Sequence, residues 1–327
     1  MLASLLARLP ADDPRVRVGP RVGEDAAVIE MGDRLLVAKT DPITFATDVV
    51  GWYAVHVNAN DIATMGAEPR WFMATALLPE RTEERAVEAI FDQIAEACRG
   101  LGVIAVGGHT EITLDLARPI LIGCMLGETT PDRLVTSAGA RPGDVVILAG
   151  PIAVEGTALL AREAGGALCA RGLGEAALEE ARGLLFRPGI SVVAAAQAAC
   201  GAGGVTALHD PTEGGLATGL LELALASGVG LEIEADAVPA LPLTREVCAA
   251  LGLDPLGLIA SGSLLIAAKA AAADGVLRAL ADAGVSAACI GRVVGPEHGL
   301  LLLERGRARP IPRFAQDEVA RYFEEQG

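Results

Sequence analysis

The stretch Asp210-Pro211-Thr212-Glu213-Gly214-Gly215-Leu216-Ala217 places two glycines where a turn runs into an apolar segment, Leu216 to Ala226. Glycine at such a junction lets the backbone come close to a ligand, and the N–H groups at the start of a helix attract anions such as phosphate. Glycine pairs are also common in turns that only support a fold. The stretch therefore predicts a helix that begins at this turn, with either a phosphate site or a purely structural turn at its start.

Four short clusters upstream repeat one theme, a carboxylate or an amide beside small residues. Their shared chemical character predicts that they contribute to one site. The clusters are Gly23-Glu24-Asp25-Ala26-Ala27, Thr40-Asp41, Asn58-Ala59-Asn60-Asp61-Ile62-Ala63-Thr64-Met65-Gly66-Ala67 and Gly107-Gly108-His109-Thr110-Glu111.

The third cluster lies in a predicted helix from Trp52 to Met65, which stops at Gly66 with Pro69 just beyond it. Asn58 and Asp61 are three residues apart and share one face of that helix. An amide oxygen and a carboxylate side by side are hard oxygen ligands of the kind that Mg²⁺ accepts. The alternative is a solvated polar stripe on a surface helix.

Short apolar runs bounded by glycine, proline or charge predict strands. The helix predicted between them, Thr82 to Arg99, has Thr82 as its N-cap and ends at Gly100. Further helices are predicted over Val154 to Ala164, Ser191 to Cys200 and Ala272 to Ala283, and the tail from Arg305 to Arg313 is expected to be extended. The predicted strands are Leu35 to Ala38, Trp71 to Leu77, Val103 to Val106, Ile120 to Gly127, Val145 to Ala149, Leu231 to Ile233 and Leu264 to Ala267.

In order and wording these motifs resemble the superfamily of ATP-dependent enzymes that holds aminoimidazole ribonucleotide synthase, formylglycinamidine ribonucleotide synthetase, selenophosphate synthetase, thiamine-monophosphate kinase and the hydrogenase-maturation carbamoyl dehydratase. The resemblance runs from about Gly19 to about Val294. The segments Gly143 to Ile152 and Leu251 to Leu256, with the Gly214 turn, look most like the hydrogenase-maturation (expression/formation protein) branch. The thiamine-monophosphate kinases share the first half of the chain but carry different motifs in the second.

Three departures from that branch affect the expected chemistry. The branch ends in a cysteine that carries a carbamoyl group, whereas this sequence ends at Gly327 and its last cysteine is Cys289. The thiol chemistry is therefore not expected. The family's aspartate in the glycine-rich loop is replaced by His109, which is a poorer Mg²⁺ ligand than a carboxylate and stands near Glu111. Glu213 stands where the branch commonly has an arginine, and its negative charge would repel a phosphate.

The resemblance implies a two-domain α+β fold like that of aminoimidazole ribonucleotide synthase. Residues 1–137 would form an N-terminal ATP-binding domain whose strands pair across a homodimer, and residues 138–327 a C-terminal α/β sandwich. The glycine- and proline-containing stretch from Ser137 to Gly143 interrupts the pattern between them.

The resemblance also implies ATP and Mg²⁺ as ligands and assigns the site residues. Lys39, one of two lysines in the chain, stands directly before Thr40-Asp41, where it is either a phosphate contact or a surface lysine at a strand end. His109 and Glu111 are the catalytic candidates. Asp25, Asp41, Asn58 and Asp61 are expected to hold the metal, and Lys39, Gly107, Gly108, Asp210, Thr212, Gly214 and Gly215 the nucleotide.

Composition restricts partners and location. The net charge of −16 and the pI near 4.7 are unfavourable for a nucleic-acid or anionic-membrane surface. Six scattered cysteines with no Cys-x-x-Cys pair predict reduced, mostly buried thiols in the cytoplasm. The segment from Met1 to Pro10 is too short for a signal sequence or a membrane span.

Together these features predict a Mg²⁺-dependent, ATP-using enzyme that phosphorylates an amide, carboxylate or similar oxygen of a small or carrier-bound substrate. The sequence does not identify the acceptor substrate. It is also compatible with a protein partner beyond the homodimer. The alternative is a non-catalytic nucleotide-binding partner protein, since the changes at His109 and Glu213 are those expected of an inactivated copy. A phosphotransferase similar to thiamine-monophosphate kinase is the third interpretation.

Overall fold

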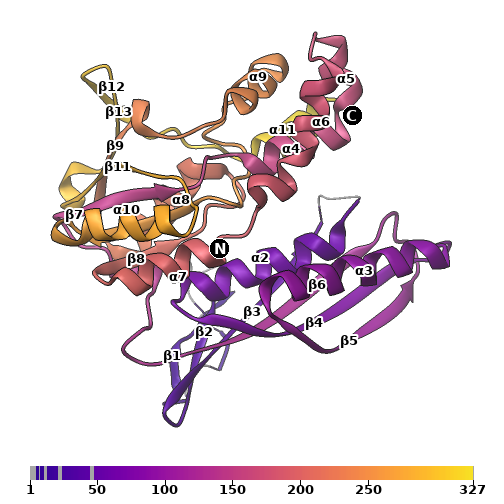
Figure 1. Ribbon diagram of the computed structural model, residues 1–327, viewed down its shortest axis with the longest axis horizontal. Helices are drawn as coiled ribbons and strands as arrows, with labels where there is room; N and C mark the ends of the chain where they lie inside the picture. The colour runs from indigo at the N-terminus through magenta and orange to yellow at the C-terminus, as the bar shows by residue number, and fades with distance from the viewer. Residues whose placement is uncertain (1–4, 7, 11–12, 21–23, 45–47, 327) are drawn as a thin grey trace. The chain divides into compact units, whose positions relative to one another are not determined.

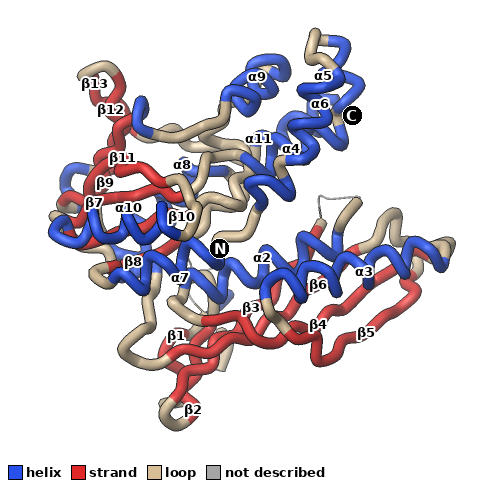
Figure 2. Tube along the Cα trace, viewed as in Figure 1, coloured by secondary structure: helices blue, strands red, loops and turns tan. Residues whose placement is uncertain are grey.

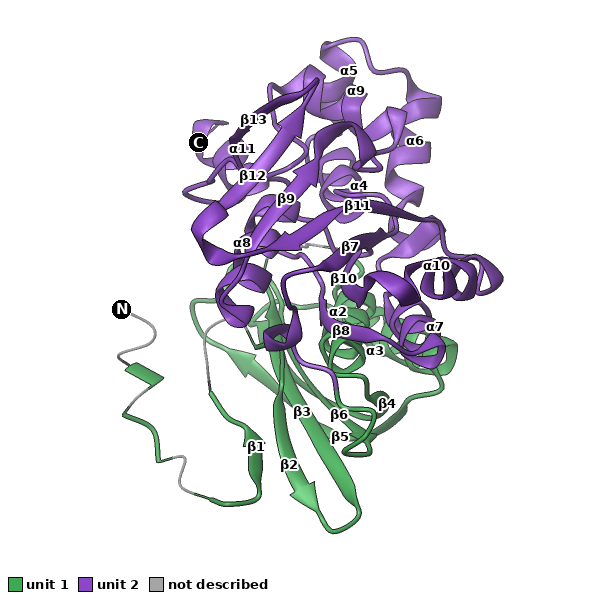
Figure 3. Ribbon diagram, turned by 90° about the vertical axis from the view of Figure 1, so that its left-hand side faces the viewer, with its two compact units in different colours: residues 1–134 green, residues 135–327 purple. Residues whose placement is uncertain are grey.

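The computed structural model describes residues 5–6, 8–10, 13–20, 24–44 and 48–326. Gly23 and Gly327, which were named above, lie outside these ranges. The chain divides into two compact units, Met1–Leu134 and Val135–Gly327 (Figure 3). The division falls just before the glycine- and proline-containing stretch from Ser137 to Gly143.

In the described part of the first unit, six strands form one sheet in the order β1-β2-β3-β6-β4-β5, and only β4 and β5 are parallel neighbours. Two helices, α2 (Val50–Thr64) and α3 (Glu84–Leu101), pack on each other and on one face of this sheet (Figures 1 and 2). The strands are β1 (Val16–Val18), β2 (Ala27–Met31), β3 (Arg34–Ile43), β4 (Glu68–Pro79), β5 (Ile104–Thr113) and β6 (Ile120–Thr129).

Strands β3 and β6 show why one sheet face binds the helices. Successive side chains of a strand point to opposite faces, so alternate apolar residues form one buried surface. Val37 of β3 and Met125 of β6 are fully buried on the helix side. Their neighbours on the other side, such as Ile122 and Leu126, are only half-buried. The sheet therefore has a second apolar face, and no helix among the described residues of this unit covers it.

The predicted ends of the first helix are close to those of α2, and Gly66 follows it with a φ of 65°. The prediction for the next helix was wrong at its start. The hydroxyl of Thr82 donates to Pro79 O at 2.8 Å instead of capping the helix, and Glu83 is the N-cap residue of α3. This helix continues past Gly100 because Gly102, with a φ of 68°, is the residue that ends it.

The glycine-rich cluster from Gly107 to Glu111 was predicted as a loop, and the structure corrects this. The cluster forms the second half of β5, at the edge of the sheet. A Cβ on Gly108 would lie 2.2 Å from Ala74 O of β4, so this glycine is needed where the two strands approach. The register also shifts between Phe72 and Met73, next to the glycines.

In the second unit, seven described strands form a sheet in the order β13-β12-β9-β11-β7-β10-β8, parallel only between β9 and β12. The consecutive residues Val146, Ile147 and Leu148 of β7 are all fully buried, so both faces of the sheet centre are covered. The strands are β7 (Asp144–Ala149), β8 (Val205–His209), β9 (Gly230–Glu234), β10 (Leu264–Lys269), β11 (Ala287–Val294), β12 (Leu300–Glu304) and β13 (Arg307–Pro310).

Helices α7 (Val193–Ala202) and α10 (Ala273–Asp282) pack on each other and on β10, whereas α8 (Gly215–Ser227) contacts β8 and β9. Helix α8 begins at the glycine turn, as predicted from the sequence. The remaining α-helices of this unit are α4 (Val154–Glu163), α5 (Gly165–Ala170), α6 (Glu175–Gly183), α9 (Pro242–Leu251) and α11 (Glu318–Gln326).

One stretch of the described chain, Glu175–Ala202, has the length and mean hydropathy of a membrane span. It is not one continuous helix. Arg187 has extended backbone angles (φ −147°, ψ 108°) and Pro188 follows it, between α6 and α7. The stretch therefore consists of separate helical segments packed in the second unit.

The cysteines are all free. Cys98 and Cys248 are buried, and burial raises the pKa of the Cys98 thiol to about 11 and that of Cys248 to about 12. Cys169 and Cys289 are exposed, against the expectation of mostly buried thiols. Cys169 lies in the short helix α5 and Cys289 in β11, at exposed positions that the spacing of the cysteines could not reveal.

Candidate functional site

The first unit contains a compact charge cluster built from β3 and α2. The Lys39 ammonium lies 3.3 Å from Asp41 Oδ2 and 3.3 Å from Asp61 Oδ1, so one cation bridges two carboxylates. Lys39 and Asp41 share the face of β3 that contacts α2, and Asp61 projects from that helix. The side chains of Lys39 and Asp61 are 21% and 8% exposed. Poor access to water strengthens the attraction between these charges.

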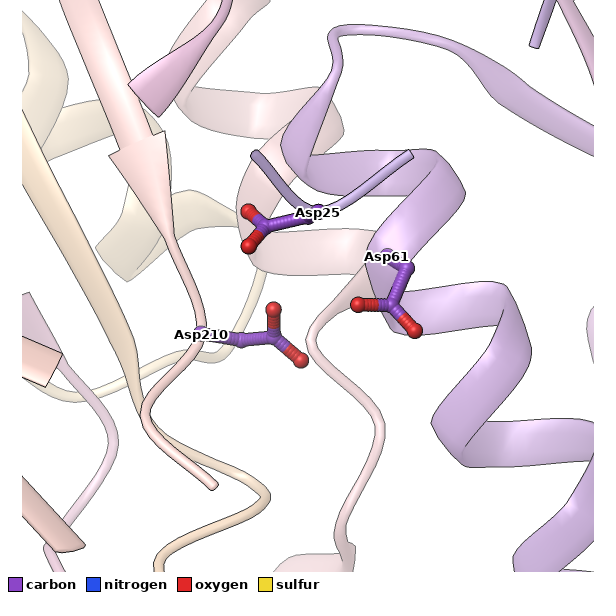
Figure 4. A group of neighbouring side chains, drawn as sticks. All are labelled: Asp25, Asp61 and Asp210. Atoms are coloured by element: carbon purple, nitrogen blue, oxygen red, sulfur yellow. The ribbon is translucent and has the colours of Figure 1, made fainter. Parts of the chain in front are cut away.

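A third carboxylate of this unit joins the cluster. One carboxylate oxygen of Asp25, just before β2, and one of Asp61 lie within 4.8 Å of each other (Figure 4). Both side chains are buried. Oxygen atoms at this separation are close enough to share one divalent cation after a small shift, and carboxylate oxygens are the ligands that Mg²⁺ prefers. The residues present therefore fit the predicted metal.

Asn58 has a structural role in addition to the one predicted. Its side chain is fully buried, and its Oδ1 accepts the Asp41 N–H at 2.9 Å while its Nδ2 donates to Ala54 O at 2.8 Å. The amide thus fixes the backbone of β3 beside α2 and positions Asp41. A Cβ on Gly123 would lie 2.3 Å from Asn58 Nδ2, which explains the glycine there. The role of Asn58 as a metal ligand stays a prediction, since its oxygen has a second lone pair.

The structure does not bring His109 and Glu111 to the cluster in the same unit. Their cross-strand partners on β4 are Thr75 and Leu77, on the sheet face away from α2. Strand β5 is also three positions from β3 in the sheet, or about 14 Å at normal strand spacing. His109 Nε2 lies 3.7 Å from Glu111 Oε2, and both side chains are more than half exposed. Gly107 and Gly108 belong to the same edge strand.

In the second unit, a carboxylate already occupies the turn that was predicted to bind phosphate. The N–H of Gly214 donates to Asp317 Oδ2 at 2.7 Å, and the N–H of Gly215 donates to Thr212 O at 3.0 Å. Asp317 Oδ1 also accepts the N–H of Val319, which caps α11. The helix start does attract an anion, but the anion is a side chain of this chain.

Gly215 is required by packing. Its φ is 63°, and a Cβ there would lie 2.6 Å from Leu256 O and 2.7 Å from Leu258 O. The segment containing Leu251-Gly252-Leu253-Asp254-Pro255-Leu256, which was singled out in the sequence, therefore packs directly on the glycine turn. Thr212 supports the same arrangement, since its carbonyl also accepts the Ala260 N–H at 3.3 Å.

Replacing Gly215 by valine should lower the melting temperature of the protein by several degrees. Backbone strain at positive φ and a clash with two carbonyl groups together should cost about 2–4 kcal/mol. Gly275→Val is the matched control, because a Cβ at Gly275 meets nothing within 4 Å. Calorimetric melts of the three proteins test this. Equal melting temperatures for Gly215→Val and the parent would show that the turn tolerates a side chain.

Asp210 follows β8 in the second unit and is buried (Figure 4). The preceding residue, His209, is held by a side chain of α8, with its Nε2 3.1 Å from Glu222 Oε2. His209 and Asp210 are therefore not arranged as an acid–base pair with each other, as neighbouring residues on a strand point in opposite directions.

Two buried carboxyl groups near the glycine turn were missed from the sequence. Burial raises the pKa of Glu155, in α4, to about 7, and its Oε2 accepts no hydrogen bond from a described residue. Burial likewise raises the pKa of Asp317 to about 6, against the effect of its two backbone hydrogen bonds. The exposed Glu213 adds repulsion to both. Asp317 could have been recognised as an N-cap before the amphipathic run of Val319, Tyr322 and Phe323.

These raised pKa values make stability depend on pH. A carboxyl whose folded pKa exceeds its unfolded value stabilises the fold fully below the unfolded pKa, and this contribution is lost as pH rises through the folded pKa. The second unit should therefore lose stability as the pH rises from about pH 4 to about pH 7.

Glu155→Gln should raise the unfolding free energy at pH 8 by about 2 kcal/mol and leave it nearly unchanged at pH 4, because the amide has no charge to bury. Denaturant titrations at both pH values measure this. Glu246→Gln, at an exposed position of α9, is the control and should change neither value. A variant that loses stability at pH 8 would show that the Glu155 carboxylate is stabilised in the fold.

Comparison with known proteins identifies the family of the chain. Its residues 23–129 match the model of the AIR synthase related protein N-terminal domain, and residues 141–302 match that of the C-terminal domain. The carbamoyl dehydratase HypE of Rhodobacter capsulatus is 32% identical over 91% of this chain and 87% of its own length. That of Cupriavidus necator is 32% identical over 80% of this chain and 73% of its own length. This chain belongs to the AIR synthase related family.

Solved structures of the family share the fold. A crystal structure of Escherichia coli HypE superposes with a TM-score of 0.77, at 27% identity over 98% of each chain. A structure described as HypE in complex with ATP has a TM-score of 0.73 at 24% identity, covering 97% of this chain and 95% of that one. A ThiL structure complexed with AMPPCP and TMP has a TM-score of 0.71 at 22% identity, covering 90% and 91%. The predicted two-domain α+β fold is confirmed.

Proposed function

We propose that this member of the family is a Mg²⁺-dependent, ATP-using enzyme that phosphorylates an amide, carboxylate or similar oxygen of a small or carrier-bound substrate. The observation that carries the proposal is the charge cluster in which Lys39 bridges Asp41 and the buried Asp61, with the buried Asp25 beside them. Such a partly buried cluster is unfavourable as mere structure, since charges withdrawn from water are usually replaceable by apolar packing. Relatives named HypE, one of them solved with ATP, support the nucleotide.

Each residue of the cluster has a separate role in this proposal. Asp25, Asp41 and Asp61 would hold Mg²⁺, which screens the charge of the triphosphate when bound. Lys39 supplies a positive charge for the phosphates from a strand whose position is fixed. Asn58 keeps Asp41 in register by its two hydrogen bonds to the β3 and α2 backbones. Positioning and charge neutralisation account for most of the rate in phosphoryl transfer.

His109 and Glu111 cannot act at this cluster within one chain, because they lie on the opposite sheet face and on the edge strand. We propose that they, with Gly107 and Gly108, serve the homodimer instead, in which the nucleotide would lie in a cleft shared by the two N-terminal units. The sheet face that carries Trp71, Ile122 and Leu126 is apolar, and no helix in the described part of this unit lies over it. A second copy would cover that face, in keeping with the predicted pairing of N-terminal strands.

Carrier-bound substrates and a further protein partner are part of the same proposal. One related structure is described as a HypE-HypF complex, so a protein with this fold can form a complex with a second protein. We place the activity in the cytoplasm, where free thiols such as those of this chain stay reduced.

The direct test is ATP hydrolysis by the purified protein with and without Mg²⁺, alone and with candidate amide or carboxylate acceptors. Hydrolysis that needs Mg²⁺ and rises with an acceptor would support the enzyme. Tight Mg²⁺-ATP binding without turnover under every condition would instead favour the non-catalytic nucleotide-binding protein. Transfer to the phosphate of a thiamine monophosphate probe would favour the kinase.

A further inference from the structure

A cavity of about 560 Å³ lies within the second unit, apart from every residue assigned above to ATP or Mg²⁺. One wall is a face of α8 that starts at Ala217, with Gly228 and Val229 just after the helix. The other walls are the turn before β12 with the first residues of that strand, and the segment from Pro310, the last residue of β13, to Phe314. Cavities that bind small molecules usually measure about 300–1,000 Å³. The space is therefore of ligand size.

The walls of this cavity are apolar. Leu221, Leu225, Leu301 and Ile311 contribute to the lining, and Leu225 is 67% exposed although it is a large aliphatic residue. An exposed apolar surface of this kind is typical of a binding groove. The body of a ligand that fits here must be apolar.

The lining contains a single fixed charge, that of Arg313. The other ionisable residue there, His298, has its Nε2 3.4 Å from Glu297 Oε1. In a chain with 42 Asp and Glu residues among 327, no carboxylate lines this cavity. Arg313 does line it, is exposed, and forms no ion pair with another described residue. His298 and the Thr218 hydroxyl are further polar groups there. A guanidinium without a carboxylate partner, beside an apolar wall, favours a ligand with one anionic group.

We propose that this cavity binds a small amphipathic anion, with an aromatic or short acyl body against α8 and a carboxylate, sulfonate or phosphate group at Arg313. The site is distinct from the Lys39–Asp41–Asp61 cluster and does not depend on the proposed ATP chemistry. A ligand bound here contacts α8 and the segment that leads to α11.

Two fluorescent probes with one aromatic body test the proposal. 8-Anilino-1-naphthalenesulfonate carries an anionic group, and N-phenyl-1-naphthylamine is the same body without it. The full-length protein should bind the sulfonate at one saturable site. Arg313→Gln should weaken the sulfonate about tenfold, the usual effect of losing a charge-assisted hydrogen bond, and should change the affinity of the neutral probe less than twofold. Arg278→Gln, at an exposed position of α10, should change neither.

A second pair of variants separates charge from shape. Leu225→Glu adds a carboxylate to the wall and should weaken the sulfonate much more than Leu225→Gln does. Melting curves of all variants check that they fold. The proposal is overturned if the sulfonate does not saturate, if Arg278→Gln weakens it as much as Arg313→Gln, or if Mg²⁺-ATP displaces it. If Arg313→Gln weakens the binding of both probes equally, the assignment of the ligand's anionic group to Arg313 is also overturned.

Discussion

Asp61→Asn should weaken the binding of Mg²⁺-ATP roughly 100-fold, which corresponds to about 2.7 kcal/mol of binding free energy. Asp61 is 6% exposed, and its carboxylate lies between Asp25 and Lys39. The substitution keeps the shape of the side chain and removes one negative charge. Magnesium then loses a ligand, and Lys39 loses its ion pair with Asp61.

Isothermal titration of the variant and the parent with Mg²⁺-ATP measures this change. Asp92→Asn is the matched control, because Asp92 is exposed on the outer side of α3 and should leave the affinity unchanged. Melting temperatures show whether Asp61→Asn still folds. An unchanged affinity in a folded variant would show that the cluster is not part of the nucleotide site. The proposed function would then lose the observation on which it rests.

Ile122→Arg should convert a dimer into monomers and abolish most ATP turnover. Ile122 lies on β6 beside Thr75 of β4, on the apolar sheet face without helices. If a second copy covers this face, the variant buries an unpaired guanidinium, at a cost of several kcal/mol. Dissociation should therefore increase by at least 100-fold. Turnover should fall with it, because we place the nucleotide in a cleft shared by the two N-terminal units.

Light scattering after size-exclusion chromatography, at several protein concentrations, measures the oligomeric state. Phe91→Arg is the control, since Phe91 is 51% exposed on α3 and lies away from this sheet face. A parent protein that is already monomeric, or an Ile122→Arg variant that stays dimeric, would contradict the proposed interface. A monomeric variant with full ATP turnover would instead keep the enzyme and reject the shared cleft.

Two predicted site residues, Asn58 and Gly214, make contacts that the sequence did not indicate. Asn58 and Asp61 do lie three apart on one helix, as the spacing indicated, but the Asn58 amide is used by the backbone of β3. The prediction placed both side chains at a ligand because the spacing of residues along a helix shows which side chains share a face. It does not show which strand packs on that face. Similarly, Asp317 reaches Gly214 from a distance of 103 residues in the sequence.

Local chemistry in the sequence determined much of this protein. Alternating apolar residues specify the buried face of β3, Gly66 ends α2, and the paired glycines start α8, because each depends on neighbours within a few residues. The order of the motifs also sufficed to indicate the family. Strand β12 and helix α9 were missed, and β13 was predicted only as part of an extended tail, since short segments acquire their structure mainly from packing.

Only the tertiary structure decided which motifs meet. The pairing of β3 with β6, β6 with β4 and β4 with β5 joins segments far apart in the chain, and its register puts Lys39 and His109 on opposite faces of one sheet. A shift of one residue in any of these pairings would reverse the facing of the following strand. The sequence identified the charged residues of the site, but long-range strand register determined which of them share it.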